Sequence, residues 1–313
     1  MKQGYKIAIA TLVVIVLVLF GASWYFLDYS LSQDEVYNQE EEIATLKENY
    51  PQLAEWTDSV VLRNALRDTF IVNNGTRLHA FYLAAQSPSK RTAVLVHGYK
   101  DCALMMLRYG YIYNTDLGYN ILLPDLHGHG QSEGEDIRMG WLDRRDVIRW
   151  IGVADSIFGG GNQMVVHGLS MGAATTMMVS GEPDVPAGVK AFVEDCGYTS
   201  VWDEFGGELK KQFHLPAFPL MYTTSWTCQL RYGWNFREAS ALSQVAQCTR
   251  PMLFIHGDAD TFVPTEMVYR VYEAHPGPKT LWIAAGSTHA QAYHDHPVEY
   301  TEQLHSFLSK YIK

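Results

Sequence analysis

The sequence has 313 residues, 47% of them hydrophobic and 19% charged, which is the balance of an ordinary globular protein. This length accommodates one large domain with an insertion. The net charge of −10 argues against nucleic acid, and against anionic lipid headgroups, as the main partner.

The N-terminal stretch from Ile7 to Leu27 contains no charged residue. As a helix it would reach about 31 Å, enough to cross the hydrocarbon core of a bilayer. Trp24 and Tyr25 fall where an interfacial aromatic belt is expected. Two lysines precede the stretch and acidic residues follow it, which orients the body of the chain outward. We therefore predict a single-pass signal anchor at residues 1–27 and an extracytoplasmic body.

A cleaved signal peptide is the alternative, because Gly21 and Ser23 have the small side chains of a cleavage site. The uncleaved anchor is preferred because apolar and aromatic residues continue past that site. No cysteine precedes Cys102, which argues against a lipidated N-terminus. With either N-terminus the rest of the chain is exported, and the alternative yields a secreted protein.

Residues 28–68 are charged and amphipathic, and predict a linker with one or two helices. The turn Asn73-Asn74-Gly75 between apolar runs predicts a hairpin. From there strand and helix patterns alternate, which predicts an α/β fold over residues 69–313, a mostly parallel sheet with helices on both faces. Strands are expected at 92–96, 120–124, just before Gly168, 189–194, 251–256 and 280–284, and helices at 102–116, 141–158, 265–274 and 298–311.

One aromatic-rich stretch, interrupted by two prolines, breaks this alternation and predicts a helical lid insertion at about residues 198–245. The aromatic side chains of this stretch either line an acyl pocket or form the core of the lid. For any single one of them, a place in the core is favoured. Cys228 and Cys248 are spaced to staple the lid in an exported protein, and free thiols are an equal alternative. The absence of C-x-x-C spacing leaves zinc or redox chemistry unsupported.

The run beginning at Gln163 has a short apolar strand, then Gly168-Leu169-Ser170-Met171-Gly172, then a helix of small residues. This is the setting of a G-x-S-x-G nucleophile elbow, which presents the Ser170 hydroxyl at the tip of a strained turn. Glycine suits positions 168 and 172 because a Cβ would clash with nearby backbone. The N-terminus of the following helix favours a developing oxyanion.

A serine nucleophile needs a base, which should follow a later strand. His289, in the loop after the strand at 280–284, is the predicted base. His294 and His296 are its rivals; they flank an aspartate in a way that suggests a metal, but no third ligand is evident and an exposed loop is favoured. His275 lies before the strand, on the wrong side of it.

The base needs an acid to orient it, and two aspartates follow the strand at 251–256. Asp258 directly follows a glycine and is expected to turn back toward loop backbone. Asp260 reaches further over the strand end, toward His289, and is the predicted acid. Asp195, at the end of the preceding strand, stays open as another position for the acid.

An oxyanion hole needs two backbone N–H groups, and we predict those of Met171 and Tyr99. Tyr99 follows the first parallel strand, where His97 is expected to shape the loop rather than act as a base. Asp125 and His129, in a glycine-rich loop after the next strand, are expected to bond loop backbone and not to react.

Taken together, these segments resemble the α/β-hydrolase superfamily, in family order and near family spacing. The resemblance is carried by HGYKD, DLHGHGQSEG, HGLSMGA, HGDADTFVP and STHA, and covers about residues 69–313. It is closest to bacterial serine hydrolases with an N-terminal membrane segment, often grouped with prolyl-oligopeptidase-like and acyl-hydrolase proteins. It implies Ser170, Asp260 and His289 as the triad, and Tyr99 and Met171 as oxyanion donors.

These residues favour a serine hydrolase that cleaves a small-molecule or lipid-like carboxylic ester through an acyl-enzyme. The alternative is a peptidase or acyl-aminoacyl hydrolase, although no acidic pair in the lid is placed to hold a free N-terminus. A non-catalytic anchored binding domain comes third, because serine, aspartate and histidine candidates are all present. No cofactor, metal or nucleic-acid partner is predicted.

Overall fold

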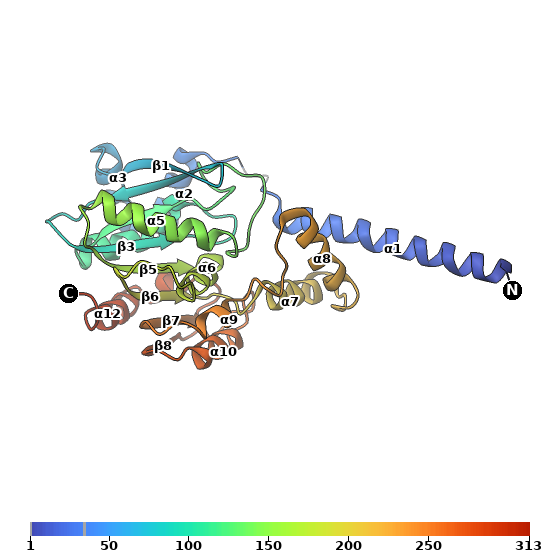
Figure 1. Ribbon diagram of the computed structural model, residues 1–313. Helices are drawn as coiled ribbons and strands as arrows, with labels where there is room; N and C mark the ends of the chain where they lie inside the picture. Colours follow the sequence, from blue (N-terminus) through green and yellow to red (C-terminus); the bar gives the residue numbers. More distant parts are fainter. Residues whose placement is uncertain (1, 34–35) are drawn as a thin grey trace. The chain divides into compact units, whose positions relative to one another are not determined.

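The computed structural model describes residues 2–33 and 36–313, which form two compact units (Figure 1). The smaller unit joins the N-terminal segment, up to Ser32, with Ser200–Ser240, which we call the insertion. The larger unit comprises Gln33–Thr199 and Ala241–Lys313. A distant piece of chain has therefore been brought beside the N-terminal helix.

The larger unit is built on an eight-stranded sheet in the order β1-β2-β4-β3-β5-β6-β7-β8. Only the pairs β1–β2 and β2–β4 are antiparallel, and every other pair is parallel. The mostly parallel sheet expected from the alternating pattern is confirmed. The strands are β1 (Arg67–Asn73), β2 (Thr76–Leu83), β3 (Arg91–Val96), β4 (Asn120–Pro124), β5 (Gln163–Leu169), β6 (Val189–Asp195), β7 (Met252–Gly257) and β8 (Lys279–Ala284).

Helices cover both faces of this sheet, as predicted. Ala93 and Leu95 of β3 belong to a buried cluster with Leu304 and Phe307 of α12. The residues between them alternate to the other face, because successive side chains of a strand point to opposite sides. There α5 and α6 pack, and α5 crosses in front of the strands in Figure 1. The helices concerned are α5 (Asp143–Ile157), α6 (Met171–Ser180), α9 (Ala241–Val245), α10 (Glu266–Ala274), α11 (Ala292–Asp295) and α12 (Pro297–Leu308).

The predicted hairpin is formed by β1 and β2, with Asn74 and Gly75 at its tip. Both have positive φ, 49° and 82°, as the tight turn between twisted strands requires. Before the hairpin lie three short elements, α2 (Gln39–Asn49), η1 (Pro51–Leu53) and α3 (Ala54–Leu62). The side chains of Leu46 and Leu53 are buried in the core of the larger unit, so this segment packs on the sheet unit.

The segment 102–116 differs in detail from the single helix predicted. It is helical from Ala103 onward, but the winding changes from a 3-10 turn to an α turn and then to a π turn. Gly110 sits in the middle, where an added Cβ would lie 2.9 Å from Ile121 of β4. Sequence periodicity does not register such changes of winding. The three pieces are η2 (Ala103–Met106), α4 (Leu107–Tyr111) and η3 (Ile112–Asp116).

The smaller unit contains three helices, α1 (Lys2–Leu31), α7 (Val201–Phe213) and α8 (Leu220–Tyr232). Among the described residues, one helix, Gln3–Leu31, is long and apolar enough to cross a bilayer, a property that membrane anchors and signal sequences share. The insertion enters after β6 and contains α7 and α8, so its helical character agrees with the sequence. Cys248 carries a free thiol that lies 3.6 Å from the Arg250 carbonyl oxygen, so the staple with Cys228 is not formed.

Candidate active site

Ser170, Asp260 and His289 all follow the carboxyl ends of parallel strands. Ser170 comes directly after β5, Asp260 lies in the loop after β7, and His289 lies in the loop after β8. Parallel strands end at a common edge of the sheet, so these loops converge there. Each of the three residues therefore follows the strand that the sequence analysis expected it to follow.

The elbow is formed by close backbone contacts that only glycine permits. An added Cβ at Gly168 would lie 2.0 Å from the Gly172 carbonyl oxygen, and one at Gly172 would lie 2.1 Å from that of Val96. Between them Ser170 adopts φ 55° and ψ −117°, which costs a non-glycine residue about 1–3 kcal/mol. The strain is borne by packing around it, and it turns the serine side chain out of the strand.

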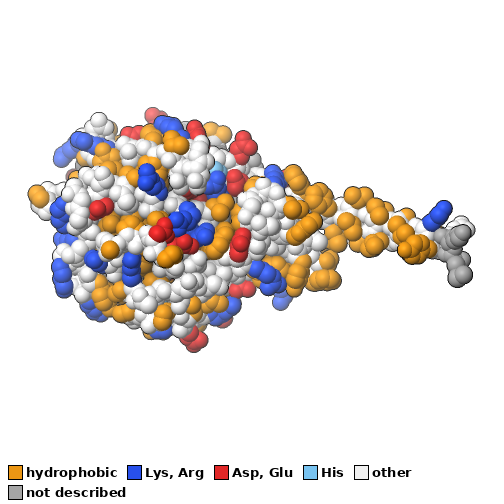
Figure 2. Space-filling view, in the orientation of Figure 1, with side chains coloured by type: hydrophobic (Ala, Val, Ile, Leu, Met, Phe, Trp, Pro, Cys, Tyr) orange, Lys and Arg blue, Asp and Glu red, His pale blue; other side chains and the backbone are white. Residues whose placement is uncertain are grey.

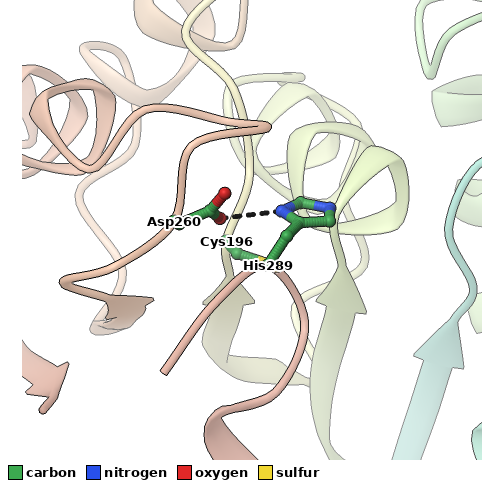
Figure 3. A group of neighbouring side chains, drawn as sticks. All are labelled: Cys196, Asp260 and His289. Atoms are coloured by element: carbon green, nitrogen blue, oxygen red, sulfur yellow. Dashed lines mark hydrogen bonds and ion pairs between the residues drawn. The ribbon is translucent and has the colours of Figure 1, made fainter. Parts of the chain in front are cut away.

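The three residues are joined by two short hydrogen bonds. Ser170 Oγ lies 2.8 Å from Nε2 of His289, and Nδ1 of His289 lies 2.7 Å from Oδ2 of Asp260. Figure 3 shows the Asp260 carboxylate pointing at the imidazole ring. The other carboxylate oxygen accepts the backbone N–H groups of Phe262 and Val263, at 2.9 and 3.0 Å. The loop therefore fixes the orientation of the carboxylate.

The environment of Asp260 keeps its carboxylate ionised. Burial alone would raise its pKa, but hydrogen bonds from His256 and His289 outweigh burial and lower the pKa to about 2. An ionised carboxylate only accepts hydrogen bonds, so Nδ1 of His289 carries the proton. The lone pair of Nε2 then faces the Ser170 hydroxyl, which is the arrangement a general base requires.

His256, at the end of β7, also helps to hold Asp260, and the sequence analysis did not single it out. Its Nε2–H lies 2.9 Å from the Val263 carbonyl oxygen and 3.3 Å from Oδ2 of Asp260. Burial would lower its pKa, but Asp260 and the buried Glu194 outweigh burial and raise it. The sequence did contain a signal for this role, because His256 is the first residue of HGDADTFVP, the segment that contains Asp258 and Asp260.

The rival acids have other partners. Asp258 accepts the backbone N–H of Gly286 at 2.6 Å, which is the backbone bond expected of it. Asp195 accepts the hydroxyl groups of Tyr300 and Tyr109, at 2.8 and 3.4 Å. Burial raises the pKa of Asp195 to about 6. Asp260 is thus the aspartate that the structure brings to His289.

The rival histidines also have other partners. His294 pairs with Asp295 at 3.1 Å and is exposed, in the short helix α11 rather than in the loop expected. His296 donates from Nε2 to the Ala285 carbonyl oxygen at 2.9 Å. His275 lies 3.4 Å from the Val245 carbonyl oxygen. None of these bonds joins a histidine to Ser170 among the described residues.

The loop after β3 lies against the nucleophile. A Cβ added to Gly98 would be 3.4 Å from that of Ser170, so the neighbouring Tyr99 is held close to the elbow. His97 accepts the Leu126 N–H at Nε2, 2.9 Å away, and donates from Nδ1 to the Gly98 carbonyl oxygen, 2.8 Å away. His97 therefore shapes this loop, as predicted. Met171, the other expected donor, is the first residue of α6.

Asp125 and His129 hold the glycine-rich loop after β4 together. The Asp125 carboxylate accepts the N–H groups of Ala103 and Gln131, at 2.8 and 3.0 Å, and lies 2.6 Å from Nδ1 of His79. His129 accepts the Lys100 N–H at 3.3 Å and donates to its own loop. Both residues bond backbone, as the sequence analysis expected of them.

Cys196 lies beside the acid–base pair, and the ligand atoms of Cys196, Asp260 and His289 all lie within 4.8 Å of one another (Figure 3). Burial raises the pKa of the Cys196 thiol well above its usual range, whereas a metal ligand must be a thiolate. Both nitrogens of His289 are also already hydrogen-bonded. The cluster therefore fits a neutral thiol packed against an acid–base pair better than a metal site.

Comparison with known proteins identifies the family of the chain. A model described as the prolyl oligopeptidase family, Peptidase_S9, matches residues 108–313. The chain belongs to this family. The Bacillus subtilis protein YqkD is 29% identical over 227 residues, which cover 72% of this chain and 74% of YqkD.

Two solved structures are similar in fold. The Pyrococcus furiosus esterase Pf2001 has a TM-score of 0.63 at 21% identity, and the match covers 79% of this chain and 92% of Pf2001. Est1E of Butyrivibrio proteoclasticus, solved with ferulic acid bound, has a TM-score of 0.59 at 19% identity, covering 78% and 98%. With the strand order above, these matches establish the α/β-hydrolase fold, and the predicted fold class is confirmed. The family and the fold make the protein an α/β-hydrolase enzyme.

Proposed function

We propose that this hydrolase cleaves carboxylic esters with Ser170 as nucleophile, His289 as base and Asp260 as acid. The observation that carries the proposal is the continuous chain of hydrogen bonds, 2.8 Å from Ser170 to His289 and 2.7 Å from His289 to Asp260. A serine hydroxyl is a weak nucleophile at neutral pH, and a neighbouring imidazole with a free lone pair is what activates it.

In the first half of the reaction, Nε2 of His289 takes the hydroxyl proton as Ser170 Oγ bonds to the acyl carbon. The carbonyl oxygen becomes an oxyanion, which accepts hydrogen bonds from the N–H groups of Tyr99 and Met171. The tetrahedral intermediate then expels the alcohol, which leaves with the proton held on Nε2. The products of this half are the acyl-enzyme and the free alcohol.

In the second half, water takes the place of the alcohol. His289 removes a proton from the water, whose oxygen bonds to the acyl carbon, and the collapse of the second intermediate returns the proton to Ser170 Oγ. The carboxylate of Asp260 stabilises the imidazolium formed in each half, because its pKa of about 2 keeps it negatively charged at neutral pH. The acid is released and the enzyme is restored.

Ester cleavage is favoured over peptide cleavage by the named structural relatives. Pf2001 is described as an esterase, and Est1E binds ferulic acid. The description of the family as a prolyl oligopeptidase family favours the second candidate, a peptidase or acyl-aminoacyl hydrolase with the same triad. A panel of p-nitrophenyl esters of short and long acyl chains, set beside aminoacyl p-nitroanilides, separates the two. Turnover of the anilides alone would overturn the ester proposal.

We also propose that α1 anchors the protein in a membrane, with the catalytic body on the extracytoplasmic side and a small or lipid-like ester as substrate. The length and apolar composition of α1 support an anchor, and secretion after cleavage of α1 is the alternative. Intact mass and membrane fractionation of the expressed protein separate the two. An anchor keeps residues 1–27 on the mature chain, and the enzyme then sediments with membranes.

The nucleophile is tested with a fluorophosphonate probe, which reacts with activated serines. We expect the wild-type protein to be labelled and Ser170→Ala not to be. Ser287→Ala is a control in the loop of His289, because the Ser287 hydroxyl is buried and donates to Asp295 rather than to a triad residue. A wild-type protein that resists the probe would refute the catalytic role of Ser170 and would favour an anchored binding domain.

A further inference from the structure

The helix α8 of the insertion packs against the last turns of α1. Ser23 donates from its hydroxyl to that of Thr223, 2.8 Å away, and Ser23 is completely buried. The guanidinium group of Arg231 lies 4.4 Å above the ring of Trp24 and forms an ion pair with Asp28. The two helices are thus joined by polar contacts at several levels, within one compact unit.

These contacts determine how deep α8 lies if α1 spans a bilayer. The first charged residue after the apolar stretch of α1 is Asp28, which marks where the helix leaves the hydrocarbon. Ser23 lies about 7.5 Å along the helix axis before Asp28. A helix that lies in the membrane interface buries its apolar face about 5–10 Å into the boundary between headgroups and acyl chains. The partner of Ser23, α8, is therefore held at the level of this boundary.

The exposed side of α8 carries large apolar side chains that contact no core, and Phe218, just before the first residue of the helix, continues this row. Four large side chains at intervals of four residues are exposed: Phe218 by 73%, Tyr222 by 50%, Trp226 by 62% and Leu230 by 63%. The side chains that α8 buries are Leu220 and Met221 in its first turn and the smaller Thr224, Ser225, Thr227 and Cys228 further along. Figure 2 shows hydrophobic side chains running along α1 and continuing onto the surface beside its C-terminal end.

The charges around this face suit a phospholipid surface. The insertion Ser200–Ser240 is neutral overall, whereas the whole chain has a net charge of −10. Its four basic residues, Lys210, Lys211, Arg231 and Arg237, lie in the stretch that contains α8, and its four acidic residues, Asp203, Glu204, Glu208 and Glu238, lie outside that stretch. Basic side chains beside an apolar helix face are the pattern of helices that lie in the interface of anionic membranes. The whole-chain charge, which argued against lipid headgroups, does not describe this surface.

We propose that α8 is an interfacial membrane helix, whose face of Phe218, Tyr222, Trp226 and Leu230 is seated among the lipids of the bilayer that α1 spans. The proposal rests on α1 being a retained anchor. Aromatic rings suit this depth because their apolar bodies face acyl chains while their polar groups face water. The insertion is thereby held against the membrane by two helices rather than tethered by one.

The test uses quenching of tryptophan fluorescence by brominated lipid. The full-length protein, with its mass verified, is reconstituted in vesicles of phosphatidylcholine and phosphatidylglycerol, with bromine near the headgroup end of the acyl chains or with none. The difference between wild type and Trp226→Phe isolates the quenching of Trp226 among the eight tryptophans. We expect most of this component to be lost in brominated vesicles. The substitution is conservative and the site is exposed, so folding is preserved.

Trp24→Phe reports on the anchor separately. If the component of Trp24 is quenched and that of Trp226 is not, the anchor stands and the docking of α8 is overturned. If neither is quenched, the anchor fails and the docking fails with it, while ester hydrolysis is judged by its own assay. Trp226 could also be protected from quenching at first and lose this protection when the protein is diluted into excess lipid. That result would show that a second copy of the chain covers this face, which also overturns the proposal.

Discussion

All ten residues of α6, from Met171 to Ser180, are buried, whereas the largest side chains of α8 are its exposed ones. The two helices are similar in length and both begin beside glycine or proline turns, yet they face different surroundings. α6 is enclosed by protein, in contact with β5, β6 and α9. α8 turns hydroxyl and thiol groups inward and aromatic rings outward. The smaller unit buries Trp234 and Phe236 in a core of its own, but it leaves the large apolar side chains of one face of α8 exposed.

The two units are therefore stabilised in different ways. In the larger unit the elbow has no room for a larger residue, because a Cβ atom added at Gly168 or Gly172 would lie 2.0–2.1 Å from a backbone oxygen. In the smaller unit, exposed rings contribute little to folding in water, because the apolar surface that they present stays uncovered. Substitutions in the larger unit should accordingly have large effects on activity or folding, and matched ones in the smaller unit should have small effects.

The largest effect is expected from Asp260→Asn, which removes the charge that orients and stabilises His289. We expect kcat for a p-nitrophenyl ester to fall by about 10⁴-fold, as for the loss of a triad acid. Asp258→Asn is the matched control and should change kcat little, because Asp258 bonds the Gly286 backbone. Equal losses in the two variants would contradict the choice of Asp260. Circular dichroism establishes that both variants are folded.

Next in size is Gly172→Ala, which places a methyl group 2.1 Å from the Val96 carbonyl oxygen. We expect the free energy of unfolding to fall by about 3 kcal/mol, measured as a shift of the urea midpoint in detergent. The counterpart in the smaller unit is Gly207→Ala in α7, where nothing lies within 4 Å. That substitution should raise stability by about 0.5–1 kcal/mol, since alanine is the better helix former. A larger loss of stability for Gly207→Ala than for Gly172→Ala would contradict the packing described for the two sites.

A moderate effect is expected at Glu194, whose carboxyl group is buried in β6 and accepts the Gly197 N–H at 3.0 Å. Burial raises its pKa from 4.5 to about 8, so the folded protein keeps a proton that the unfolded chain releases. Stability should therefore fall as pH rises between these values, by up to about 1.4 kcal/mol per pH unit. Glu194→Gln should flatten this dependence in melting experiments, while Glu302→Gln, at an exposed position, should leave it unchanged.

The smallest effect is expected from Trp226→Ser in detergent, within about 0.5 kcal/mol of wild type, because the indole is 62% exposed. Trp150→Ala in the larger unit, where the indole is 1% exposed, should cost about 3–5 kcal/mol. Urea unfolding followed by circular dichroism compares the two. A large loss on replacing Trp226 would mean that its ring supports the protein fold, which would remove the distinction between the units.

Much of the larger unit was predictable because its signals are local. The strand from Asn120 to Pro124 has the predicted bounds, and the hairpin turn follows from Asn74 and Gly75. The elbow was predictable because strand, glycines and small-residue helix are contiguous in the sequence. The winding of the segment 103–116 was not predictable, because a 3-10, an α and a π turn place apolar residues at nearly the same spacing in the sequence. The contact of His256 with Asp260 was not predictable either, because it depends on how the loop after β7 folds back.

The α/β alternation, the elbow at Ser170, the apolar N-terminal helix and the short set of histidines and aspartates open to a catalytic role could all be predicted from the amino-acid sequence. Each of these depends on residues near one another in the chain. The folded structure was needed to show that Asp260 rather than Asp258 meets His289, because these aspartates are two positions apart in one loop and differ only in where the loop turns them. It alone also joined α1 to α8 and thereby showed which side of α8 is exposed.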